Sequence, residues 1–219
     1  MRTIQHTRTL TLAAIGVAAL LFAGSSANAA GYKLADKVGV DIAEFRDEIV
    51  DIKKAVDVTM SALDKIVAQA TVDPRKAFKE FDKSVPKIDD AAAKAKKRAD
   101  DMRARGKEYF DKWEKDIAGV NDPEIRKLAE ERKAKLQGAF GNIKTTMEPA
   151  RDQFNAWLAP LKDLQKYLSQ DLTISGIDAA KELIAKSRTE GAAVQKSLET
   201  VIAELNTVVA TITPAKAKK

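Results

Sequence analysis

Four long segments of this 219-residue chain carry apolar residues at alternating steps of three and four. No other feature limits the fold as strongly, because such steps place the apolar side chains along one face of an α-helix and are typical of helices packed against one another. The first segment shows the pattern with Val38, Ile42, Phe45 and Ile49. The sequence therefore predicts an all-α fold in which four amphipathic helices share one core.

Two Asp-Pro pairs mark where helices begin. Asp73 and Asp122 are good N-cap residues, and the proline after each of them suits the first helical turn. A third break is expected around residues 172–176, and the apolar stripe of the third segment is regular from Leu136 onward. The predicted helices lie near residues 33–71, 74–118, 123–171 and 175–212.

Such short connections force long neighbouring helices to run antiparallel. We therefore expect one elongated domain over residues 30–213 with an up-down-up-down course. Its helices form either a single four-helix cross-section or two coiled-coil hairpins stacked end to end. If the second hairpin turns near residue 173, Gly191 faces Phe154 and Trp157, whose rings would fill the space over the glycine.

The first 29 residues have the pattern of a cleaved export signal. Arg2 and Arg8 give a positive start, residues 10–23 are apolar, and Ala27 and Ala29 form the A-x-A pattern of a cleavage site. The apolar run falls short of the roughly 20 residues that span a bilayer. We expect cleavage after Ala29 and a mature protein that is periplasmic or secreted.

The excess of positive charge lies at the two ends of the chain. There are 38 Lys and Arg residues against 32 Asp and Glu, a formal net charge of +6. Arg2 and Arg8 belong to the predicted signal, while Lys216, Lys218 and Lys219 belong to residues 214–219, which we expect to form a basic, disordered tail. The body between them is nearly neutral, which argues against a nucleic-acid partner.

The residue types used most in catalysis are scarce. The single histidine, His6, lies in the predicted signal, and the chain has no cysteine. Adjacent acids such as Asp89 and Asp90 diverge by about 100° on a helix and do not converge on one metal ion. The sequence also lacks a phosphate-binding glycine loop and a nucleophile elbow. We therefore expect no enzyme, with no catalytic residue, no metal ligand and no cofactor.

The densest basic stretch lies in the second predicted helix. It consists of Lys94, Lys96, Lys97, Arg98, Arg103, Arg105 and Lys107. If the first hairpin turns near residue 73, the numbers of facing residues sum to about 146, which places the stretch opposite acids between residues 41 and 51. The favoured interpretation is a charged flank that fixes helix register. The alternative is a site for anionic lipid or another polyanion.

Several short motifs resemble one bacterial protein family. They are Gly31-Tyr32, Asp36-Lys37-Val38-Gly39-Val40, Trp113-Glu114, Ile125-Arg126 and Met147-Glu148-Pro149. In this order, over most of the chain, they are similar to the family catalogued as domain of unknown function 2959. The resemblance implies an exported or lipid-anchored all-helical protein. It implies no activity, since none is established for the family.

These observations predict an exported, non-enzymatic coiled-coil protein of the bacterial cell envelope with a structural or interaction role. Its partner is expected to be an envelope protein or a cell-wall component, and the sequence leaves a homo-oligomer open. The alternative function is an amphipathic protein that binds a lipid surface or polyanion. It would use the stretch 94–107 and the C-terminal lysines for peripheral contact with anionic lipid.

Overall fold

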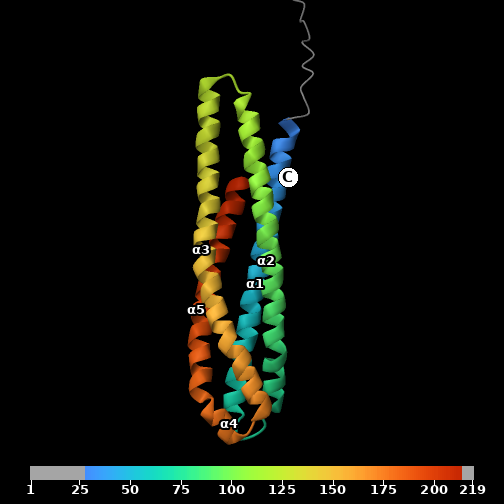
Figure 1. The fold of residues 1–219 in the computed structure, drawn as a ribbon, viewed down its shortest axis with the longest axis vertical. Helices are drawn as coiled ribbons and strands as arrows, with labels where there is room; N and C mark the ends of the chain where they lie inside the picture. The colour runs from blue at the N-terminus through green and yellow to red at the C-terminus, as the bar shows by residue number, and fades with distance from the viewer. Residues whose placement is uncertain (1–27, 214–219) are drawn as a thin grey trace, which may run out of the picture.

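The computed structural model describes residues 28–213, which form five helices and no strand (Figure 1). They are α1 (Asn28–Ala68), α2 (Arg75–Ala118), α3 (Pro123–Gln170), α4 (Ile174–Ala179) and α5 (Lys181–Ile212). The predicted all-α fold is confirmed. Most of the predicted export signal, including Ala27, and the predicted tail over residues 214–219 lie outside the described residues.

Local hydrogen bonds explain where the long helices begin. Asp122 is the N-cap of α3, as predicted, and its carboxylate accepts from the backbone N–H groups of Glu124 and Ile125 at 2.9 and 3.0 Å. At the start of α2 the N-cap position is Pro74 rather than Asp73. Asp73 instead accepts from the backbone N–H of Arg75 at 3.1 Å.

The single helix predicted over residues 175–212 is wrong, because the chain divides it at Ala180 into α4 and α5. Polar side chains hold the start of α4 in place. The hydroxyl of Thr173 caps α4 by accepting from the N–H of Gly176 at 3.0 Å, and the hydroxyl of Tyr167 donates to the carbonyl of Gly176 at 3.1 Å. A Cβ on Gly176 would also overlap Asp171. The short helix is thereby fixed against the end of α3.

Contacts between distant residues show that neighbouring long helices run antiparallel. Between α1 and α2, Lys65 pairs with Glu80 at 3.0 Å, and Arg105 pairs with Asp41 at 2.6 Å. Equivalent contacts join α2 to α3, α3 to α5 and α1 to α5, through Asp89–Lys162, Trp157–Ser187 and Asp64–Arg188. Each long helix therefore has two long neighbours, and the four of them surround one core along the lower part of the rod in Figure 1.

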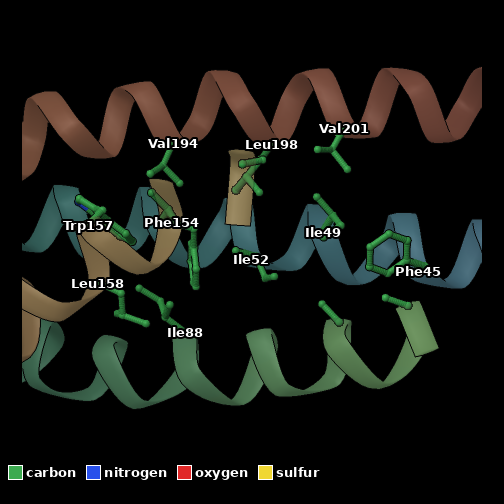
Figure 2. Packing of buried hydrophobic residues seen from close by; sticks show 14 of the residues in the cluster. Phe45, Ile49, Ile52, Ile88, Phe154, Trp157, Leu158, Val194, Leu198 and Val201 are labelled. Carbon is green, nitrogen blue, oxygen red and sulfur yellow. The ribbon is translucent and has the colours of Figure 1, made fainter. Parts of the chain in front are cut away.

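The heptad stripes form this core. Figure 2 shows side chains from all four long helices pointing toward one another. The largest buried ones include Phe45, Phe81, Trp157 and Leu161, each at most 1% exposed. Each such side chain contributes about 1.5–3 kcal/mol through its burial, so the rod is stabilised along most of its length.

Two hydrogen bonds between buried groups join neighbouring helices. The hydroxyl of Thr59 donates to that of Ser84 at 2.8 Å, which joins α1 to α2. The indole N–H of Trp157 donates to the carbonyl of Ser187 at 2.8 Å, which joins α3 to α5. These bonds fix the register of each pair, because leaving such a group unpaired in the core costs about 1–3 kcal/mol.

The contact predicted for Gly191 yields a stability test. A Cβ at this position would overlap the sulfur of Met60 and lie 3.1 Å from the indole nitrogen of Trp157. We expect Gly191→Val to lower the free energy of unfolding by about 1–3 kcal/mol through overpacking. Gly138 is the matched control, because nothing lies within 4 Å of its added Cβ. Gly138→Ala should raise stability by about 0.5–1 kcal/mol.

Urea denaturation followed by circular dichroism measures both effects. The packing account is contradicted if the two variants shift the unfolding midpoint in the same direction.

Candidate functional site

The structure distributes the predicted basic stretch around α2. Two of its arginines turn toward α1, where Arg98 lies 2.6 Å from Glu44 and Arg105 lies 2.6 Å from Asp41. The neighbouring carboxylate of Asp41 raises the pKa of the Arg105 guanidinium above its ordinary value. These two residues therefore serve the α1–α2 contact, as the favoured interpretation predicts.

The other cations of the stretch point in several directions. Arg103 and Lys107 pair within α2, with Asp100 and Asp111. Three are exposed and make no ion pair with any residue of the described range 28–213, namely Lys94, Lys96 and Lys97. Because successive helical residues differ by about 100° in direction, these three do not share one face. The structure therefore does not bring the seven residues together as one cationic site.

Residues 28–213 also lack the features of a metal site and of a membrane span. Within this range no group of three or more histidine, cysteine or acidic residues is placed to hold a metal ion. Likewise, no helix of the described range is sufficiently long and apolar to cross a membrane.

The end of the rod opposite α4 differs from the rest, because α5 stops before its neighbours do. α5 has 32 residues and α3 has 48. The last turn of α5 lies beside Arg132 of α3, whose guanidinium donates to the carbonyl of Thr211 at 2.5 Å. Figure 1 shows the α2–α3 hairpin and the start of α1 continuing past this point. We call this region, residues 28–38, 109–118 and 123–131, the open end.

Large apolar side chains are exposed at the open end. Tyr32 is 54% exposed, Ile125 56% and Leu128 65%. On the same helix as the last two, the apolar stripe is buried from Leu136 onward. Leu128 lies one helical turn before Arg132, so it is on the face of α3 that contacts α5 farther along the rod. It is exposed because α5 does not extend that far.

A groove of about 360 Å³ lies between the start of α1 and the end of α2, and Tyr32 is part of its lining. Its apolar lining includes Tyr32, Leu34, Tyr109 and Trp113. The ring of Trp113 packs edge-on against Tyr109, with centroids 5.5 Å apart. The indole N–H of Trp113 is buried and has no acceptor among the described residues. The groove is therefore a mainly apolar recess, and aromatic rings form part of its lining.

Burial raises the pKa of the Tyr109 phenol above its ordinary value of 10.0, and the nearby charge of Arg132 opposes this. The folded state thus retains the phenolic proton at a pH where the unfolded chain loses it. The free energy of unfolding should therefore fall as pH rises above about 10.

We expect Tyr109→Phe to remove this alkaline loss of stability, while Tyr32→Phe, the matched control, should retain it. The measurement is the urea midpoint of each variant at about pH 9 and about pH 11, on either side of the ordinary phenol pKa. An identical loss in both variants would contradict the assignment to Tyr109.

A protein-family model described as "Protein of unknown function (DUF2959)" matches residues 25–212. The chain belongs to this family. The match agrees with the resemblance carried by the short motifs, and it includes both hairpins and the open end. No curated protein and no solved structure matches the chain.

The exposed residues of this DUF2959 protein were not among the sequence-predicted site residues. A signal for them exists in the sequence, since the predicted third helix is longer than the fourth and therefore extends beyond it. The regular stripe also begins only at Leu136, which leaves Ile125 and Leu128 outside it. Unequal helix length, rather than a motif, is what indicates the open end.

Proposed function

We propose that this DUF2959 protein is an exported, non-enzymatic interaction protein of the bacterial cell envelope that binds a partner through the open end. The observation that carries the proposal is the exposure of Tyr32, Ile125 and Leu128 at the end of the rod where α5 stops before its neighbours do. Large apolar side chains are also exposed near α4, among them Val72, Ile174 and Leu183. Contiguous exposed apolar surface on a folded protein marks an interaction site more often than scattered single residues do.

Two other observations support the proposal. The described helices bury their apolar stripes against one another, which leaves the long sides of the rod mainly charged and polar. The family match begins at residue 25, close to the predicted cleavage site after Ala29, where the mature domain of an exported protein would start.

Site-specific photo-crosslinking in the living cell tests the proposal. A photoreactive residue replaces Leu128 at the open end or, as matched control, Leu183, which is 58% exposed on α5 near α4. We expect a discrete crosslinked adduct in the envelope fraction from position 128 and none from position 183. Adducts of equal yield at both positions, or at neither, would overturn binding through the open end.

The second candidate function is peripheral binding to anionic lipid. It is favoured by Lys94, Lys96 and Lys97, which are exposed and form no ion pair with a described residue. It is opposed by the closed core, because an amphipathic helix must expose its apolar face to insert into a bilayer. A helical bundle that kept its core closed would bind lipid by charge alone.

Liposome flotation separates the two candidates. We expect the protein to float with anionic vesicles only at low salt, because charge contacts alone are screened at about 0.15 M salt. Flotation that persists at that salt, is lost in Lys94→Glu/Lys97→Glu and is retained in Lys166→Glu/Lys181→Glu would favour the lipid function instead.

A further inference from the structure

Six lysines form a line along the solvent face of α2. They are spaced by three, four or seven residues, so their directions around the helix differ by no more than about 80°. All six are exposed, and none makes an ion pair with a residue of the described range 28–213. The line covers about 32 Å at 1.5 Å per residue, along the lower part of the rod in Figure 1. We call it the lysine stripe, and its members are Lys76, Lys79, Lys83, Lys87, Lys94 and Lys97.

The acids around the stripe leave most of its charge uncompensated. Along the length of the stripe, Asp90 is the one acid on the same face of α2, and it makes no ion pair within the described range. Glu80, at the edge of this face, is bound to Lys65 of α1 at 3.0 Å. The other acids of α1 and α2 at this level of the rod also have partners, namely Asp82 and Asp89 toward α3 and Asp51, Asp57 and Asp64 on α1. The six lysines are therefore offset on their own face by Asp90 alone.

The stripe does not stabilise α2. The N-terminus of a helix carries positive partial charge, so Lys76 and Lys79 lie where a cation is unfavourable, and α2 has no acid in its first turn. Lysines four residues apart, such as Lys79, Lys83 and Lys87, also repel one another. Arg105 pairs with α1, but the six lysines make no ion pair with a neighbouring described helix. Residues that break local rules for helix stability are expected mainly at functional sites.

We infer that the lysine stripe binds an extended anionic polymer that carries phosphate groups and lies along α2. The stripe is separate from the open end, so the inference goes beyond the binding function proposed above. A lysine ammonium is a compact point charge that binds phosphate without a fixed geometry. A line of such charges favours a thread-like ligand, because anionic groups joined in one chain engage the lysines together at a high effective concentration.

The stripe suits other anionic partners less well. No large apolar residue of α2 is exposed, so a bilayer would be held by charge alone. Single-stranded nucleic acid binds through bases stacked on aromatic rings, whereas the aromatic residues of α2 at this level, Phe78 and Phe81, pack against the core. A free phosphate ion would contact only one or two of the lysines. A phosphate polymer uses the whole line and requires no apolar or aromatic contact.

The probe is linear inorganic polyphosphate that is long enough to cover the stripe, and tripolyphosphate is its short control. Titration calorimetry with the purified protein measures both at several salt concentrations. The logarithm of the association constant for polyphosphate should fall against the logarithm of salt concentration with a slope of about 4, since each contact with a single chain contributes about 0.7. At equal total phosphate, tripolyphosphate should bind at least about tenfold more weakly.

Two triple variants that remove the same charge locate the binding. The stripe variant should weaken polyphosphate binding at least about tenfold and lower the salt slope by about 2, whereas the control should change neither. Because Gln and Lys have similar helix propensities, both variants should fold, which circular dichroism verifies. The stripe variant is Lys79→Gln/Lys83→Gln/Lys87→Gln, and the control, at exposed lysines of α1, α3 and α5 without an ion pair in the described range, is Lys37→Gln/Lys135→Gln/Lys196→Gln.

The inference is overturned if the protein does not bind polyphosphate, if the two triple variants bind it alike, or if tripolyphosphate binds as tightly as the polymer. It is overturned in favour of a membrane if phosphatidylglycerol vesicles float the protein at about 0.15 M salt and the stripe variant abolishes flotation. Tighter binding of a single-stranded oligonucleotide than of polyphosphate would overturn it in favour of nucleic acid. The crosslinking test at position 128 concerns the open end, so its outcome is independent of these results.

Discussion

The burial of one apolar stripe on α1 between α2 and α5 is the contact on which the rest of the bundle depends. Val38, Ile42, Val56 and Leu63 on this stripe are fully buried. α1 packs closely against both neighbours, whereas α2 and α3 pack less closely against each other. The bundle is therefore held together by α1 and by the α3–α5 contact. The ends of α2 and α3 are not needed for this core. They extend past the end of α5 and thereby form the open end.

Much of the fold follows from the sequence because its determinants are local or periodic. The stripes predict the helices, and a hairpin turn near residue 73 predicts the register that brings Arg105 to Asp41. The division at Ala180 could not be predicted in this way, because the apolar pattern continues across it. The short helix α4 is held at Gly176, whose N–H donates to the hydroxyl of Thr173 and whose carbonyl accepts from the hydroxyl of Tyr167. Whether such polar side chains meet is decided by the three-dimensional arrangement rather than by the pattern.

The candidate site was less predictable, for two physical reasons. Basic residues that are close in the sequence need not lie on one surface of the protein. Successive residues on a helix differ by about 100° in direction, so Lys96 and Lys97 point to different sides of α2. An apolar residue at a core spacing is buried only if a neighbouring helix reaches it. Leu128 lies about two helical turns before Leu136 on the same helix, yet Leu128 is 65% exposed and Leu136 only 1%, because α5 stops between their levels.

At the open end, α2 and α3 are joined by local contacts. These contacts do not involve Tyr32, Ile125 or Leu128. They are the cap from Asp122, the ion pair between Lys133 and Glu114 at 2.7 Å, and the bond from Arg126 to the carbonyl of Val120. A surface that is already ordered loses little conformational freedom when a partner binds, so a small apolar contact can still yield useful affinity. Leu128 is exposed on this hairpin, so the proposed binding at the end of the rod would leave the core stripe of α1 undisturbed.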